Sequence, residues 1–119
     1  MSVVKNQLRQ AVSQAEIFAK RPDVNASNWA DFFTKSLELL DSSSPTIPFY
    51  PDMIPTSGFT LEARQVLAST AQSYVFGGMG SWNDLGFEKP EVNEEYRRIT
   101  KDLYEAVKIA IVMSSNSFV

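Results

Sequence analysis

Apolar residues recur every three or four positions along the last third of the chain, and this spacing constrains the fold more than any other feature. After Pro90 the pattern runs through Val92, Tyr96, Ile99, Leu103, Ala106, Ala110 and Met113. Residues at this spacing lie on one side of an α-helix, so a long amphipathic helix is predicted, with Pro90 in its first turn. Tyr104, Val107 and Ile111 widen the apolar side. We therefore expect this helix to be central, and buried on more than one side toward its C-terminal end.

Two further helices are predicted before Asp41. The residues from Ser2 to about Lys20 have the same apolar period, with Ser2 as a candidate cap and Pro22 just beyond the helix. The next helix is expected to start near Ser27 or Asn28, because both are good N-cap residues. Its apolar stripe consists of Trp29, Phe32, Phe33, Leu37 and Leu40.

A third helix is predicted after Thr60, which is also a good N-cap residue. The residues that share its apolar side are Ala63, Val66, Leu67, Thr70, Ala71 and Tyr74. We expect Gly77 and Gly78 to end this helix, since glycine readily adopts the left-handed conformation that is common just after a helix.

The segment from Pro45 to Pro55 carries four prolines among apolar residues. It cannot continue a helix, and it is too apolar for a free linker. We expect an extended strap over the core, either as a plain connection or as a binding loop. No stretch shows the alternation typical of a strand. The sequence thus predicts an all-α fold of about four helices, in a small bundle-like single domain over residues 1–119 with the Pro-rich strap between helices two and three.

The residue types restrict the chemistry available to the chain. It contains no histidine and no cysteine, which removes the commonest general base, the usual nucleophile pairs and most transition-metal ligands. We assign no catalytic residue, no metal site and no cofactor, and we expect the chain not to be an enzyme; a small hydrolase or a ligand-binding enzyme is an alternative. No stretch resembles a membrane span or a signal peptide, so a cytoplasmic location is expected.

The charge balance favours a basic protein partner. Lys and Arg number 11 against 14 for Asp and Glu, which gives a net charge of -3. Nucleic-acid binding depends on cationic side chains, whereas a negative surface attracts a basic protein. We expect no nucleic acid, membrane or small-molecule partner.

A glycine-rich junction, Phe76-Gly77-Gly78-Met79-Gly80-Ser81-Trp82-Asn83-Asp84, separates the third and fourth predicted helices. It lacks the lysine and the preceding strand of a phosphate-binding P-loop, and it lacks the third glycine of a dinucleotide site. We interpret it as a tight turn. Its structural anchors are expected to be Gly77, Gly78, Gly80 and Trp82, with the indole directed into the core.

Acidic residues follow this junction, and five of them are candidates for a partner-binding face: Asp84, Glu88, Glu91, Glu95 and Glu105. Such a face would steer a basic partner toward the chain. The alternative is that they only complement the helix dipole and keep the surface polar. Arg97, Arg98 and Lys101 interrupt the run.

The run from Phe76 to Asp84, followed by Asn93 and by Asp102-Leu103-Tyr104-Glu105-Ala106, resembles a family of small bacterial helical proteins. That family carries an aromatic-Gly-Gly-Met-Gly-Ser-x-Asn-Asp motif between two helices, and some members belong with immunity proteins of polymorphic or contact-dependent toxin systems. The resemblance covers Leu61 to Ala110. It implies an intracellular protein that binds a cognate toxin domain, often a basic nuclease, and blocks its active site or substrate channel. It implies no cofactor.

A regulatory or scaffolding role without a toxin partner is the alternative function. Such a helical protein could dimerise through apolar surface near Trp29 and the Pro-rich strap.

Overall fold

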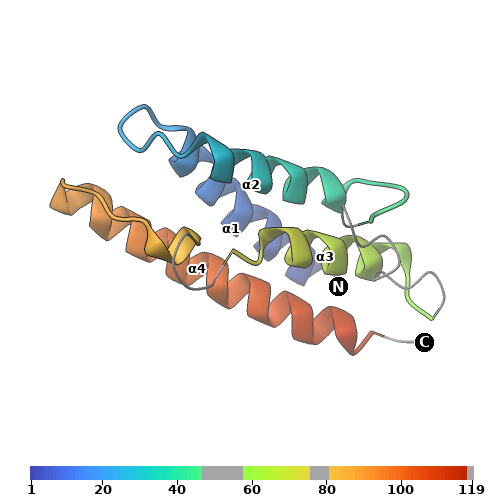
Figure 1. Cartoon of the computed structure of the whole chain (residues 1–119). Coiled ribbons are helices and arrows are strands. Elements are labelled where there is room, and N and C mark those ends of the chain that lie inside the picture. Colours follow the sequence, from blue (N-terminus) through green and yellow to red (C-terminus); the bar gives the residue numbers. More distant parts are fainter. Residues whose placement is uncertain (47–57, 76–80, 118–119) are drawn as a thin grey trace.

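The computed structural model describes residues 1–46, 58–75 and 81–117. Its helices in chain order are α1 (Ser2–Lys20), α2 (Ser27–Leu40), α3 (Leu61–Ser73), the short 3-10 helix η2 (Trp82–Asp84) and α4 (Pro90–Ser115) (Figure 1). The described residues contain no strand, so the predicted all-α, bundle-like fold is confirmed. Most of the expected strap, and the anchors Gly77, Gly78 and Gly80, lie outside the described residues.

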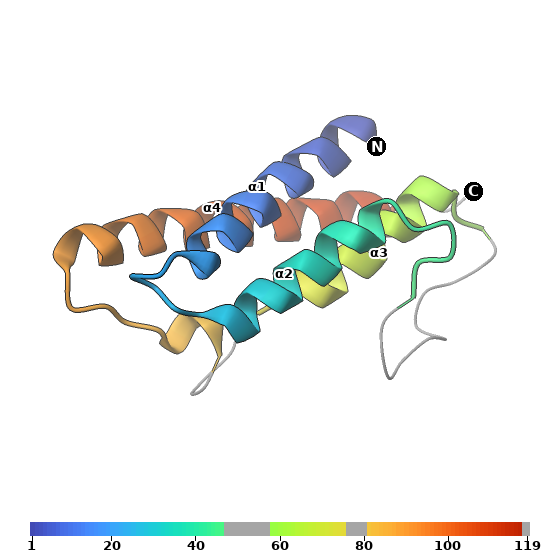
Figure 2. The same cartoon turned by 90° about the horizontal axis from the view of Figure 1, so that it is seen from above.

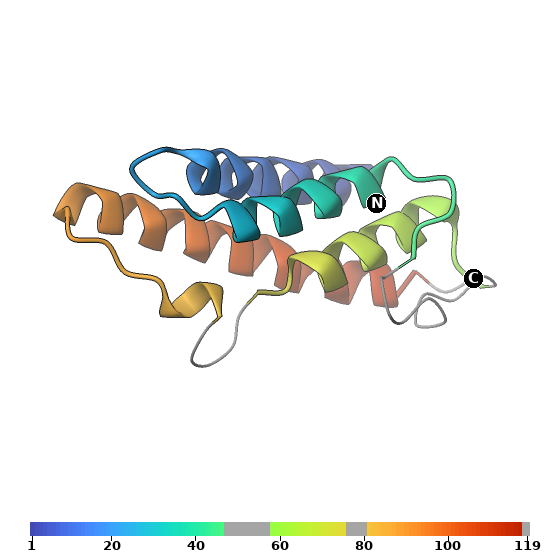
Figure 3. The same cartoon turned by 45° about the horizontal axis from the view of Figure 1, so that its top comes forward.

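The four α-helices form an elongated bundle in which each runs opposite to its neighbours (Figures 1 and 3). Helix α1 packs against α2 and α4, and α3 also packs against α2 and α4. The start of α1 and the end of α4 therefore lie at the same end of the bundle. The molecule measures 48 × 27 × 24 Å.

Helix α3 is too short to complete the bundle. It has 13 residues, whereas α4 has 26. Helix α3 lies beside the C-terminal half of α4, and η2 lies beside the N-terminal half (Figure 2). The bundle consequently has two different ends. At the aromatic end η2 covers the core, and at the more polar end α3 covers it.

Short backbone turns, rather than the predicted serine caps, begin the first two helices. Met1 is the N-cap of α1 and Ala26 that of α2, and neither start has a side-chain cap hydrogen bond, so the capping role expected of Ser2 and of Ser27 or Asn28 was wrong. The loop before α2 is fixed by its backbone: Ala26 N–H donates to Ala19 O, and Asn25 has a φ of 53°, which asparagine tolerates better than most residues.

The remaining predicted boundaries agree with the structure except at the end of α3. Thr60 Oγ1 accepts a hydrogen bond from Ala63 N–H at 3.1 Å, and Pro90 is the first residue of α4. Helix α3 ends at Ser73, so the expectation that Gly77 and Gly78 end it was wrong. Trp82 N–H donates to Val75 O, which shows that the chain has already left the helix there.

The buried side of α3 agrees with the predicted one only in part: Ala63, Val66 and Thr70 are buried as expected. Ala71 and Tyr74 are exposed, whereas the polar residues Gln65, Ser69 and Ser73 are buried. Hydroxyl groups of α2 and α3 satisfy one another across this interface: Ser36 Oγ donates to Ser69 O at 2.9 Å and lies 2.7 Å from Ser69 Oγ. The apolar pattern did not predict this part of the buried side of α3, because small hydroxyl residues occupy it.

The C-terminal half of α4 is not buried on several sides, so that prediction was wrong. Its core side is one stripe that includes Leu103, Val107 and Ala110. Val112 and Met113 are about half exposed, although α1 and α3 both pack against this helix. The most apolar run of the sequence, residues 107–113, thus lies partly on the surface. Within the described ranges, no helix is long and apolar enough to cross a membrane.

Candidate functional site

Trp82 closes the aromatic end of the core. Its side chain is fully buried, as the sequence predicted. The indole lies edge-on to Phe33 and Phe18, with ring centroids 5.1 and 6.4 Å away, and it also contacts Trp29 and Tyr96. These rings come from α1, α2 and α4, so one side chain from η2 joins three helices.

Hydrogen bonds fix the polar parts of this loop to α4. Trp82 Nε1 donates to Thr100 Oγ1 at 2.8 Å, and Tyr96 Oη donates to Trp82 O at 2.6 Å. Burial raises the pKa of Tyr96, and the neighbouring Asp84 carboxylate adds to this effect. A hydroxyl that stays protonated and donates to a backbone carbonyl serves structure and not proton transfer.

Asn93 holds the segment that leads into α4. Its side-chain amide accepts a hydrogen bond from Phe87 N–H at 2.8 Å and donates one to Phe87 O. The Phe87 ring then packs on Phe18 and Tyr96, with centroids 5.8 and 5.5 Å away. Sequence reasoning assigned Asn93 no role of its own, although an asparagine in the first turn of a helix offers both a donor and an acceptor to the preceding loop.

The charged side chains of α4 separate onto two flanks. The α1 flank, which faces α1, consists of Glu91, Glu95, Arg98, Asp102, Glu105 and Ile109; the η2 flank, which faces η2, consists of Arg97, Thr100, Lys101 and Tyr104. Helical spacing of three and four residues places each set on one side. Most of the acids therefore lie on the α1 flank, together with Arg98, while Arg97 and Lys101 lie on the η2 flank.

The five predicted partner-binding acids do not form one patch. Glu95 and Glu105 line the hollows beside α1, and helical spacing puts Glu91 on the same side of α4. Asp84 lies in η2 beside Tyr96. Glu88 is exposed in the loop before α4. The structure thus brings three of the five together on one helix.

Glu95 is engaged in an ion pair that joins α1 to α4. Arg21 lies 2.5 Å from Glu95 and 2.6 Å from Asp23, and its guanidinium lies over the Phe18 ring. Hydrogen bonds to Asp23 and Glu95 raise the pKa of Arg21, and Arg21 in turn lowers the pKa of Asp23. The carboxylate of Glu95 is therefore already paired within the fold, and Glu95 has a structural role.

Two adjoining hollows lie between α1 and the α1 flank. The larger, about 360 Å³, is lined by Gln7, Gln10 and Gln14 of α1 and by Asp102, Glu105 and Ile109 of α4, with two alanines. The smaller, about 150 Å³, includes Gln14, Ile17 and Arg98. Gln14 lines both, and we call the two hollows together the α1–α4 groove.

The apolar residues of the α1–α4 groove are open to solvent. Ile17 is 64% exposed and Ile109 is 47% exposed. Amide side chains of α1 and the carboxylates of Asp102 and Glu105 lie around them. This combination of exposed apolar side chains with hydrogen-bonding groups is typical of protein-binding surfaces.

A third hollow, of about 710 Å³, lies on the η2 flank. Asn83 and Leu85 line it from the loop. The other lining residues come from α4: Tyr96, Arg97, Thr100, Lys101 and Tyr104. It contains cations and no carboxylate, so its electrostatic character is opposite to that of the α1–α4 groove.

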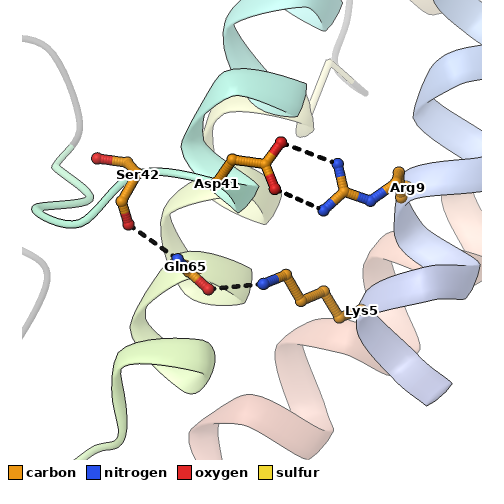
Figure 4. A network of polar contacts seen from close by, with 5 residues as sticks. All are labelled: Lys5, Arg9, Asp41, Ser42 and Gln65. Carbon is orange, nitrogen blue, oxygen red and sulfur yellow. Dashed lines mark hydrogen bonds and ion pairs between the residues drawn. The ribbon is translucent and has the colours of Figure 1, made fainter. Parts of the chain in front are cut away.

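At the polar end of the bundle, a network joins α1, α2 and α3 (Figure 4). Arg9 forms two hydrogen bonds with Asp41, at 2.9 and 3.1 Å. Lys5 donates to Gln65 Oε1 at 2.7 Å, and Gln65 Nε2 donates to Ser42 O at 2.8 Å. Each of these side chains has a partner on another segment of the fold, so we interpret the network as structural.

The described part of the chain offers no cluster of three or more acidic side chains placed to hold a metal ion. Comparison with protein-family models, with curated proteins and with solved structures finds no match for this chain. The function must therefore be inferred from the surfaces described above.

Proposed function

We propose that the chain is an immunity protein, which binds a cognate toxin domain and blocks that domain's active site or substrate channel. The observation that carries this proposal is the α1–α4 groove, where the exposed Ile17 and Ile109 lie among amides and carboxylates. The resemblance of residues 76–84 to helical immunity proteins supports a toxin as the partner. Binding and occlusion need no catalytic residue and no cofactor. We place the complex in the cytoplasm of the producing cell.

Charge on the α1 flank supports a basic partner such as a nuclease. Glu91 and Glu105 are exposed and form no ion pair within the described residues. Asp102 pairs with Arg98 only at 3.7 Å. Free carboxylates at the edge of a binding surface accelerate association with a cationic partner, while the apolar groups at its centre slow dissociation.

The test starts from the gene directly upstream of the one for this chain, which we expect to encode the toxin domain. We expect the purified chain to bind that domain at a one-to-one ratio and to abolish its activity. The proposal would be wrong if the toxin domain neither co-purified with the chain nor lost activity in its presence.

Charge reversal tests the assigned surface. The double variant Glu91→Lys and Glu105→Lys should slow association about tenfold at low salt, and less at high salt, because screening weakens steering. Glu62→Lys with Glu38→Lys is the matched control, since Glu62, like Glu91, lies in the first turn of its helix and Glu38 is exposed on α2. Equal slowing in both variants would place the interface elsewhere.

Self-association without a toxin is the second candidate. It is favoured by Phe32, which is exposed on α2 and contacts Trp29 with ring centroids 5.5 Å apart. Light scattering distinguishes the two: a dimer lost on Phe32→Ser supports self-association, and a monomer at all concentrations excludes it.

A further inference from the structure

The hollow on the η2 flank is a candidate site for a small ligand. Its volume of about 710 Å³ falls within the range of small-molecule pockets, roughly 300–1,000 Å³. Such pockets combine apolar walls with a few polar groups that fix the ligand. Here Leu85 and Tyr104 supply apolar surface, and Asn83, Arg97 and Lys101 supply polar groups.

No carboxylate of the described residues forms an ion pair with either of the two cations that line this hollow. Arg97 and Lys101 are four residues apart and line the same hollow, yet neither forms an ion pair with a described residue. Arg98, the next residue along, pairs with Asp102 on the other flank. Asp84 is close enough to affect Tyr96 but does not line the hollow. The hollow therefore has positive charge available for an anion.

The floor of the hollow is already fixed. Thr100 accepts the hydrogen bond from Trp82, and Tyr96 donates to the Trp82 carbonyl. Leu85 N–H also donates to Trp82 O. These contacts hold the floor in place, so that part of the hollow needs little ordering when a ligand binds, and this improves affinity for a given set of contacts.

The aromatic side of the hollow suits a flat group. Tyr104 is 43% exposed, and the Lys108 ammonium lies 5.5 Å from the centroid of its ring. Arginine and lysine bind carboxylates and phosphates through charge-assisted hydrogen bonds, and the arginine fork can bind two oxygens at once. A ligand that combines a flat apolar group with an oxyanion would use both features.

We propose that the hollow on the η2 flank binds a small molecule made of a flat apolar group and an oxyanion, either carboxylate or phosphate. Arg97 and Lys101 hold the oxyanion, Asn83 donates a further hydrogen bond, and the apolar group packs between Leu85 and Tyr104. This goes beyond the proposed immunity function, which uses the opposite flank of α4, and beyond the sequence, which indicated no small-molecule ligand.

The test is a titration of the full chain, followed by the amide signals in nuclear magnetic resonance spectra. The probes are phenyl phosphate and benzoate, with inorganic phosphate and phenol as half-probes. We expect saturable shifts at Asn83, Leu85, Thr100 and Lys101 with one or both full probes, and the tighter probe identifies the anion. Tighter or equal binding of a half-probe, or no saturable shift with either full probe, would overturn the proposal.

Charge-removal variants show whether the hollow itself binds. Arg97→Gln with Lys101→Gln should weaken binding about tenfold or more, as expected for the loss of a charge-assisted hydrogen bond. Arg98→Gln with Lys35→Gln removes the same charge elsewhere and should change binding less than about twofold, a free-energy difference below RT. An equal loss in both variants would mean general attraction of anions and would exclude the site. Far-UV circular dichroism checks that both variants fold.

Discussion

The indole nitrogen of Trp82 donates a hydrogen bond to the hydroxyl of Thr100 at 2.8 Å. The ring of Trp82 fills the core at the aromatic end of the bundle, while its polar edge reaches a residue of the η2 flank. One contact therefore connects the packing of three helices to the floor of a surface hollow. The stability of the fold and the shape of that hollow depend on the same side chain.

Truncation of Trp82 should strongly destabilise the protein. Trp82→Ala is expected to lower the free energy of unfolding by about 3–5 kcal/mol, because it leaves a cavity among aromatic rings. Trp82→Phe retains much of the packing but removes the Nε1 donor, so a smaller loss of about 1–3 kcal/mol is expected. Urea unfolding followed by circular dichroism measures both. Unchanged stability of Trp82→Ala combined with lost partner binding would show an interface residue and not an anchor.

The hydroxyl contact between α2 and α3 should tolerate a smaller residue better than a larger one. Ser36→Ala removes the hydrogen bond to Ser69 and should cost about 1 kcal/mol. Ser36→Leu should cost a further 1–3 kcal/mol or so, because the site is fully buried and has no room for a branched side chain. Thermal unfolding of the two variants gives the comparison. Equal stability of Ser36→Leu and Ser36→Ala would show that α2 and α3 are not closely packed here.

Acid should weaken the network at the polar end of the bundle. Arg9 lowers the pKa of Asp41 below its ordinary value, with a further contribution from Lys5. A carboxylate whose pKa is lower in the folded state stabilises the fold above its unfolded pKa, near 4, and this contribution is lost as pH falls through the folded pKa. The free energy of unfolding should therefore fall between about pH 5 and pH 2, and by less in Asp41→Asn.

The Asp41 effect should be small, below about 1 kcal/mol, because the Asp41 side chain is 69% exposed and solvent screens such pairs. Urea unfolding at several pH values measures it. Asp31→Asn, at an exposed position of α2, is the control for the removal of one carboxylate. An identical acid profile in the wild-type chain and in Asp41→Asn would contradict the assigned role of this pair.

Local sequence signals predicted where the helices lie, although not the caps of α1 and α2 or the end of α3. Apolar periodicity located α1, and Thr60 and Pro90 marked the starts of α3 and α4. The buried side of α3 was not predictable in the same way. Ser69 and Gln65 are polar by composition, and only their partners on α2, on α1 and in the loop after α2 make their burial favourable.

The candidate surfaces were predictable only in part. A helical projection of α4 separates Glu91 and Glu95 from Arg97 and Lys101, so the two flanks follow from spacing alone. Which flank faces α1 depends on the direction in which α1 packs. The pairing of Glu95 with Arg21 joins residues 74 positions apart, and no local pattern indicates it.

The shortness of α3 also bears on how this chain can change during evolution. Trp82 stands where a longer α3 would pack, and Phe18, Trp29, Phe33 and Tyr96 all rest on that one ring. A substitution at any of these positions alters the cavity that the others share. We expect viable sequences to change them as a set, so that this end of the bundle drifts in concerted steps while exposed positions on α4 diversify one at a time.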